Sequence, residues 1–239
     1  MMKPIYKPSG RAAEYGDYAL NIYTGCPHRC YYCFAPNVLR KDRESFHSHV
    51  EPRDGIVEAV RKQLATGEIK DKLIHLCFAC DPYPTGHDST ATREIINLIK
   101  DSGNHVQILT KGDGRRDFDL LDKNDWYGVS ISCNTTVQKV VEPNAFNPLS
   151  RLLTIGEAQK AGIKTWVSFE PVVEPGAVLG CIAGYFDLFD KIKVGKLNYH
   201  PSDIDWKAFG TEAERLCKKS GVEYYIKDDL RKEMMKENK

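Results

Sequence analysis

Three cysteines lie within eight residues in the segment GCPHRCYYCF (25–34): Cys26, Cys30 and Cys33. Thiolates are the usual ligands of zinc and of iron–sulfur clusters, so this C-x3-C-x2-C spacing predicts a metal centre. Structural zinc normally has four closed ligands, and Cys77 and Cys80 could complete such a site only if their strand end meets this loop. Three thiolates on an iron–sulfur cluster would instead leave one iron open for a substrate or cofactor.

The elements that must position this loop follow an alternating pattern of strand-like and helix-like runs. Strands are expected at 18–25, 72–79, 105–111, 127–134, 163–171, 190–198 and 222–228. Helices are expected at 55–67, at 90–103 with Thr90 as N-cap, near 117–123 and at 148–162, with others between and after the later strands.

This alternation predicts an α/β fold, best matched by a partial (β/α)6-type parallel barrel, with a doubly wound sheet as the alternative. We expect a single domain over residues 1–239, with a core at about 15–200 and a C-terminal βα extension at about 201–239. Active sites of such folds lie at the carboxyl ends of the strands. Polar or unusual side chains follow the strands here, namely Thr24, Cys80, Asp81, Lys111, Ser132 to Asn134, Glu170 and Asn198.

The cysteine loop, with the aromatic Tyr32 in C-x3-C-x-aromatic-C, resembles the motif of the radical S-adenosylmethionine (SAM) superfamily. Within it, the chain resembles the branch of spore photoproduct lyase and its DNA repair photolyase-like relatives. The resemblance covers roughly residues 5–200 and is carried by YTGCPHRCYYCFAP, CFACDPYP (77–84), ILTKGDGRRDFDLL (108–121), VSISCNT (129–135), VEPNAFNPLSRLLTIGEAQKAGI (141–163) and VSFEPVVEP (167–175).

By this resemblance, Cys26, Cys30 and Cys33 hold a [4Fe–4S] cluster whose fourth iron binds SAM. An electron from the cluster would cleave SAM into methionine and a 5′-deoxyadenosyl radical, which abstracts hydrogen from the substrate. The resemblance further implies the residues that bind SAM. They are Lys111 for the carboxylate, Ser132 for the ribose, the Cys80–Asp81 segment for the ammonium, Tyr32 near the adenine, and Glu170 for SAM or substrate.

The remaining candidates each have a structural alternative. Cys77, Cys80 and Cys133 could return hydrogen to a product radical, as a strand-two cysteine does in spore photoproduct lyase, or could be core residues. Arg115, Arg116 and Asn134 are candidate substrate contacts at the mouth of the site. Glu170 could instead pair with Lys193, and residues 40–49 fit a solvated loop or an anion contact. Cys181 and Cys217 are expected to be structural residues in helices.

The composition of the chain and its departures from the family narrow the range of possible functions. The net charge of +1 argues against a protein that coats nucleic acid by charge alone. We expect no membrane span, a cytoplasmic location and an external one-electron reductant of the flavodoxin or ferredoxin type. The chain is shorter than spore photoproduct lyase and has Gly112 where relatives often have serine, which argues against repair of the spore lesion.

The expected substrate is a nucleic acid base, a nucleoside or a related small molecule. A radical SAM enzyme acting on a protein or peptide is the first alternative, and a zinc-stabilised binding module is the second.

Overall fold

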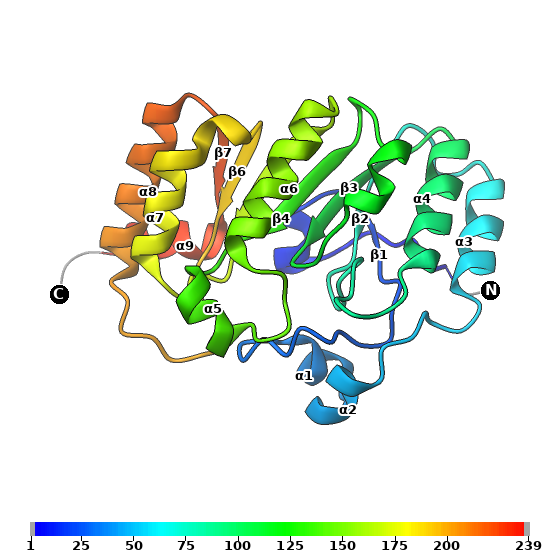
Figure 1. Cartoon of the computed structure of the whole chain (residues 1–239), viewed down its shortest axis with the longest axis horizontal. Helices are drawn as coiled ribbons and strands as arrows, with labels where there is room; N and C mark the ends of the chain where they lie inside the picture. The colour runs from blue at the N-terminus through cyan, green and yellow to red at the C-terminus, as the bar shows by residue number, and fades with distance from the viewer. Residues whose placement is uncertain (1–2, 237–239) are drawn as a thin grey trace.

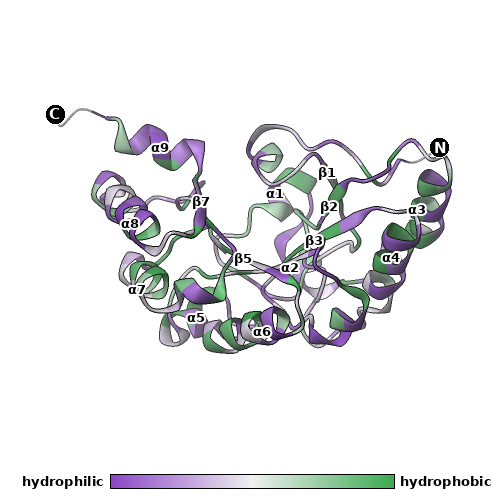
Figure 2. Cartoon of the chain, turned by 90° about the horizontal axis from the view of Figure 1, so that it is seen from above, coloured by the Kyte–Doolittle hydropathy of each residue, from purple (hydrophilic) through white to green (hydrophobic). Residues whose placement is uncertain are grey.

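The computed structural model describes residues 3–236, and its centre is one parallel sheet whose strands lie side by side in chain order. The strands are β1 Tyr18–Leu20, β2 Leu73–Leu76, β3 His105–Thr110, β4 Trp126–Ser130, β5 Lys164–Phe169, β6 Lys191–Val194 and β7 Glu223–Ile226. Because β1 and β7 are both edge strands, the sheet curves without closing (Figure 2). The predicted partial parallel barrel is confirmed, and β7 extends the same sheet by a seventh strand.

Helices connect the strands and cover the convex side of the sheet (Figures 1 and 2). The α-helices are α1 Ala35–Leu39, α2 Arg43–Ser48, α3 Ile56–Ala65, α4 Thr90–Asp101, α5 Thr135–Val141, α6 Pro148–Lys160, α7 Pro175–Tyr185, α8 Trp206–Ser220 and α9 Asp228–Met234. Three short 3-10 helices are η1 Gly10–Glu14, η2 Arg115–Leu120 and η3 Phe186–Leu188.

The two faces of the sheet differ in chemistry because successive side chains of a strand point to opposite faces. Ile74, Val106 and Val167 are fully buried on the outer face, in the hydrophobic core formed with the helices. His75 and Trp166 have the opposite parity and lie on the inner face, which is also buried but carries several polar groups. The hydrophobic core therefore lies between the sheet and the helices, and the inner face is left for polar contacts.

The N-terminal segment fills part of this inner face. The ring centroid of Tyr15 lies 5.5 Å from that of His75 and 6.0 Å from that of Trp166. On one side of the segment, Tyr6 forms an antiparallel bridge to β1, and on the other Arg11 forms an ion pair with Asp229 of α9. The segment thus runs from one edge of the open sheet to the other and covers the gap between them.

Several predicted boundaries are wrong for identifiable reasons. β1 and β2 end early because the Asn21 side chain accepts hydrogen bonds from the backbone of Phe78 and Ala79, and because Cys77 adopts a φ of +70°. Thr90 is the first residue of α4 rather than its N-cap, and the Asp88 carboxylate accepts its N–H. The helix expected near 117–123 is η2, and α1, α2 and α5 were not predicted.

Candidate active site

The cysteine loop is held in place by α2, which occupies the segment interpreted from sequence as a solvated loop. The Arg43 guanidinium donates to the backbone carbonyls of Cys30 and Cys33 as well as that of Tyr31. A Cβ on Gly25 would lie 2.2 Å from the Phe46 carbonyl oxygen, so only glycine allows the loop to approach α2 this closely. The segment is thus largely helical rather than a loop, and Arg43 among its cations is directed at the carbonyls of the cysteine loop.

The three thiols of this loop provide the donor set for a metal cluster. Cys30 is buried, and Cys26 and Cys33 are half-buried. Burial raises the pKa of all three thiols, that of Cys30 to about 12, and the nearby Lys111 ammonium counteracts the shift for Cys30 and Cys33. Iron–sulfur binding requires thiolates, so loading would release protons from this site. Within residues 3–236, no three His, Cys, Asp or Glu side chains converge on one mononuclear metal position.

Lys111 follows β3, and its ammonium lies beside the cysteine loop. Its Nζ lies 5.6 Å from the centroid of the Tyr32 ring, and no carboxylate among the described residues forms an ion pair with it. Its main chain is fixed from both sides, since its N–H donates to Asp81 at 2.8 Å and its carbonyl accepts from Phe146 at 2.9 Å. The backbone of Lys111 is therefore fixed, and its ammonium forms no ion pair within residues 3–236, although its charge acts on the nearby Glu142 carboxylate.

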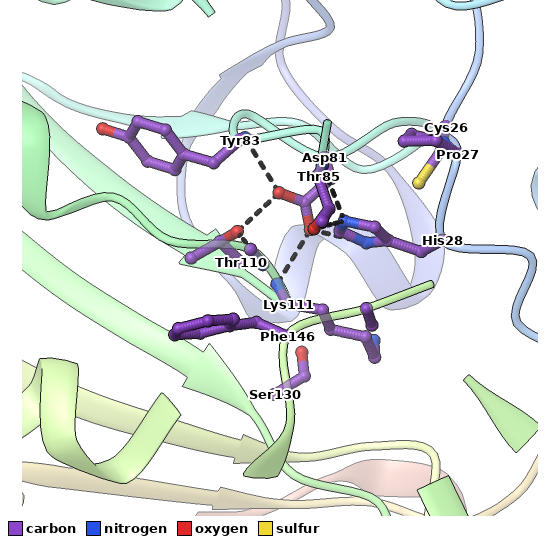
Figure 3. A network of polar contacts seen from close by, with 12 residues as sticks. Cys26, Pro27, His28, Asp81, Tyr83, Thr85, Thr110, Lys111, Ser130 and Phe146 are labelled. Atoms are coloured by element: carbon purple, nitrogen blue, oxygen red, sulfur yellow. Dashed lines mark hydrogen bonds and ion pairs between the residues drawn. The ribbon is translucent and has the colours of Figure 1, made fainter. Parts of the chain in front are cut away.

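Asp81 is at the centre of the hydrogen-bond network that positions the backbone of Lys111 (Figure 3). Its carboxylate accepts from the Thr110 hydroxyl and from the backbone N–H groups of Lys111 and Tyr83. His28 of the cysteine loop lies 3.5 Å away, and burial lowers the pKa of this ring, which is therefore neutral near pH 7. Because protein donors already surround the carboxylate, its contacts favour a positioning role, while its contact with SAM stays a prediction.

Glu142 and Arg151 form a second buried network that sequence reasoning missed. The Glu142 carboxylate accepts from Ser132, from Tyr32 of the cysteine loop and from the Arg151 guanidinium. Arg151 also donates to the Ser130 carbonyl at 2.8 Å. Burial alone would raise the pKa of Glu142, but Arg151, Lys111 and the two hydroxyls outweigh it and hold that pKa at about 2. The network joins the cysteine loop to the end of β4.

We predict that Arg151→Met destabilises the fold by about 3–5 kcal/mol, because it leaves a fully buried carboxylate without its cation. The measurement is the urea unfolding midpoint of the protein, followed by circular dichroism. The double variant Glu142→Gln/Arg151→Met removes both charges and should recover much of the loss. An Arg151→Met protein as stable as wild type would contradict the network, and so would a double variant no more stable than the single one.

Glu170 lies at the end of β5 within a cluster that includes the N-terminal segment. Its carboxylate accepts from Tyr15 at 2.7 Å and from Asn198 at 3.3 Å, and it forms an ion pair with Lys227. The suggested pairing with Lys193 is not present, because the Lys193 ammonium donates to the Glu14 carbonyl instead. A SAM or substrate role for Glu170 stays a prediction.

The other predicted site residues are engaged within the protein. Cys77 and Cys133 are buried, whereas Cys80 is half-buried and accepts from the Tyr23 N–H at 3.4 Å. Cys181 and Cys217 lie buried in α7 and α8. Arg115 forms ion pairs with Asp113 and Glu157. Arg116 forms an ion pair with Asp117 and donates a hydrogen bond to Ser89. Asn134 donates to Glu174 and caps the N-terminus of α5. Their substrate roles stay predictions.

Comparison with known proteins identifies the family. The model of the radical SAM superfamily matches residues 20–188, which include the cysteine loop and β2 to β5. The chain belongs to the radical SAM superfamily. It therefore contains the domain that radical SAM enzymes share, and the family implies SAM and an iron–sulfur cluster as cofactors. This membership sets aside the zinc-stabilised binding module.

Curated relatives of this superfamily member are longer than the segment that matches it. The uncharacterized protein ORF301 of Acidianus two-tailed virus is 28% identical over 199 residues, which cover 73% of this chain and 65% of the viral protein. The uncharacterized protein Rv2578c of Mycobacterium tuberculosis is 29% identical over 168 residues, which cover 65% of this chain and 49% of the mycobacterial protein. The chain thus spans less than two thirds of either relative.

Solved structures share the fold at low sequence identity. A spore photoproduct lyase variant has a TM-score of 0.70 and 13% identity, covering 92% of this chain and 78% of that one. Spore photoproduct lyase complexed with dinucleoside spore photoproduct gives a TM-score of 0.67 and 14% identity. This match covers 92% of this chain and 79% of the lyase. Streptococcus suis SuiB bound to precursor peptide SuiA gives a TM-score of 0.63 at 10% identity. The match covers 87% of this chain and 48% of SuiB. No helix in the described residues is long and apolar enough to cross a membrane.

Proposed function

We propose that Cys26, Cys30 and Cys33 hold a [4Fe–4S] cluster and that Lys111 binds the carboxylate of SAM at its open iron. The observation that carries this proposal is the Lys111 ammonium beside the thiol loop, which forms no ion pair with any carboxylate that the structure describes. A buried or half-buried cation normally has a counterion, so an anionic ligand is the natural partner for this one. When bound, the cluster supplies the electron that cleaves SAM to the 5′-deoxyadenosyl radical.

The chain's own residues orient the ligand and exclude water. Asp81 and Thr110 fix the backbone that carries Lys111, and Glu142 fixes the Tyr32 side chain within the loop. The Ser132 hydroxyl, for which we propose a contact with the ribose, donates to Glu142. On the inner face, Tyr15 fills the space between β2 and β5 and so limits solvent entry from the open side.

The proposed substrate is a nucleic acid base, a nucleoside or a related small molecule. The support is fold similarity: spore photoproduct lyase, complexed with a dinucleoside photoproduct, matches with the higher TM-score and over more of its own length than SuiB with its peptide. A peptide substrate is the second candidate, and the SuiB likeness favours it. Cys80 is the best-placed hydrogen donor of the three candidates, because it alone is half-buried rather than buried. A flavodoxin- or ferredoxin-type reductant in the cytoplasm completes the proposal.

A deuterium-transfer experiment tests the substrate. Reduced enzyme is incubated with SAM and with deuterated nucleosides, deuterated DNA oligomers or deuterated peptides in separate reactions, and 5′-deoxyadenosine is analysed by mass spectrometry. We expect deuterium in the 5′-deoxyadenosine from a nucleoside or DNA reaction, because the radical takes hydrogen directly from its substrate. Deuterium transferred only from peptides would overturn the nucleic acid proposal and support the second candidate.

A further inference from the structure

Two cysteines after β2, Cys77 and Cys80, form a C-x-x-C sequence. In a chain of alternating strands and helices, this spacing is typical of dithiols that cycle between the reduced form and a disulfide. Neither cysteine is a proposed cluster ligand, and the proposed function gives a role, as hydrogen donor, to Cys80 alone. The fold decides whether these two thiols can react with each other.

The chain turns sharply between the two cysteines. Cys77 has a φ of +70°, in the left-handed region that residues other than glycine rarely adopt. The side-chain oxygen of Asn21 then accepts hydrogen bonds from the backbone N–H groups of both Phe78 and Ala79, each at 2.8 Å. In an extended strand, side chains three residues apart point to opposite faces. This turn instead brings the side chains of Cys77 and Cys80 to the same side of the chain.

The two thiols interact directly. Burial raises the pKa of Cys77 well above its usual value, and a side-chain hydrogen bond with Cys80 and the charge of that neighbour raise it further. The segment after β1 holds both sulfurs. The backbone of Ile22 forms a hydrogen bond with the Cys77 thiol, and the Tyr23 N–H donates to the Cys80 sulfur at 3.4 Å. Because the pair is already adjacent and fixed, forming a bond between the sulfurs costs little chain entropy.

The two cysteines differ in exposure, and this difference sets the order of their reactions. Cys77 is buried, whereas Cys80 is half-buried. The pair lies beside the edge strand β1, because the Cys77 N–H donates to the Leu20 carbonyl at 2.9 Å. A small disulfide compound would therefore meet Cys80 first, and Cys77 would act as the second, resolving thiol.

We propose that Cys77 and Cys80 are a redox-active dithiol that closes to a disulfide by exchange with a small disulfide such as oxidised glutathione. The Cys80 thiolate attacks one glutathione sulfur, forms a mixed disulfide and releases one reduced glutathione. The Cys77 thiol then loses its proton and attacks the Cys80 sulfur, which closes the internal disulfide and releases the second glutathione. The protein gives up two electrons and two protons, the two glutathione molecules gain them, and a dithiol reductant reverses the reaction.

The disulfide leaves no thiol hydrogen on Cys80. The redox state of the pair therefore decides whether Cys80 can return hydrogen to a product radical, and this consequence rests on the proposed function. The disulfide itself does not depend on that function and is measured directly.

The test follows the two thiols by mass spectrometry. The reconstituted full chain is equilibrated without oxygen in oxidised or reduced glutathione, free thiols are alkylated with iodoacetamide, and the protein is digested with trypsin. Cleavage after Lys72 and Arg93 gives one peptide, 73–93, which contains Cys77 and Cys80 and no other cysteine. In oxidised glutathione we expect this peptide to lose two hydrogen atoms and to escape alkylation. Dithiothreitol should restore both alkylatable thiols.

Two variants test the order of the reaction. In Cys77→Ala, Cys80 should retain one bound glutathione, because no second thiol displaces it. In Cys80→Ala, Cys77 should stay unmodified, because it is buried. The buried Cys181 and Cys217 serve as internal controls in the wild type and should stay reduced.

A peptide 73–93 that keeps both free thiols in oxidised glutathione overturns the redox pair. So does glutathione that stays on Cys80 in the wild type, and so does a disulfide that joins Cys80 to a cysteine of 26–33. These masses are read without SAM. A protein that forms no 5′-deoxyadenosine with dithionite and SAM would therefore count against the proposed function alone.

Discussion

Cys30→Ala is expected to remove the iron–sulfur cluster and with it all reductive cleavage of SAM. Cys30 is the most deeply buried of the three loop thiols and the middle one in sequence. Its loss leaves only two thiol ligands, which are too few to hold the cluster. The measurement is iron and sulfide per chain after oxygen-free reconstitution, together with 5′-deoxyadenosine formed with dithionite and SAM. Both values should fall to background.

The matched control for Cys30→Ala is Cys181→Ala, which also removes a buried thiol, but from α7. That variant should keep wild-type iron content and SAM cleavage, with only the modest loss of stability expected for a small core truncation. If Cys30→Ala retained full iron and activity, the three cysteines would not be the ligand set.

Lys111→Met is expected to weaken SAM binding by tenfold to a hundredfold while leaving the cluster in place. A hydrogen bond to a charged group contributes about 1.5–3 kcal/mol, which corresponds to this range of affinity. Methionine keeps the length and apolar stem of the side chain, so the packing against Tyr32 should survive. The measurement is the dissociation constant for SAM of the reconstituted protein, with iron content and visible absorption recorded in parallel.

Lys160→Met, at the exposed end of α6, controls for the loss of a surface charge far from the loop. Normal SAM affinity in Lys111→Met would mean that another group binds the SAM carboxylate. Loss of iron in Lys111→Met would instead indicate that the lysine maintains the loop, and the assignment to SAM would fail in that case too.

The sheet could be predicted from sequence because its signal is local. Each strand is a short, largely apolar run. Successive side chains point to the outer and inner faces in turn, as Ile74 and His75 do, and this alternation can be seen in the sequence. The thiol loop could be predicted for the same reason, since all three cysteines fall within one turn-rich segment. α1 and α2 were missed because five- and six-residue helices are too short to show a helical period.

The contacts that build the site could not be predicted because they depend on tertiary structure. Nothing in sequence pairs Glu142 with Arg151, or shows that their network reaches Tyr32 in the cysteine loop. Asp81 was correctly placed after β2, but only the fold shows that its carboxylate is occupied by Thr110 and the backbone of Lys111. The sequence thus predicted Asp81 and Lys111 as candidates, and only the structure shows that Asp81 accepts from protein donors while Lys111 forms no ion pair among the described residues.

The central claim is that three protein thiolates leave one iron open and that SAM binds to it. The most direct test is electron–nuclear double resonance of the reconstituted, reduced protein with SAM labelled with nitrogen-15 at its amino group and oxygen-17 at its carboxylate. The account predicts coupling of both labels to the cluster in wild type. A protein that binds both cluster and SAM but shows no coupling to either label would contradict it.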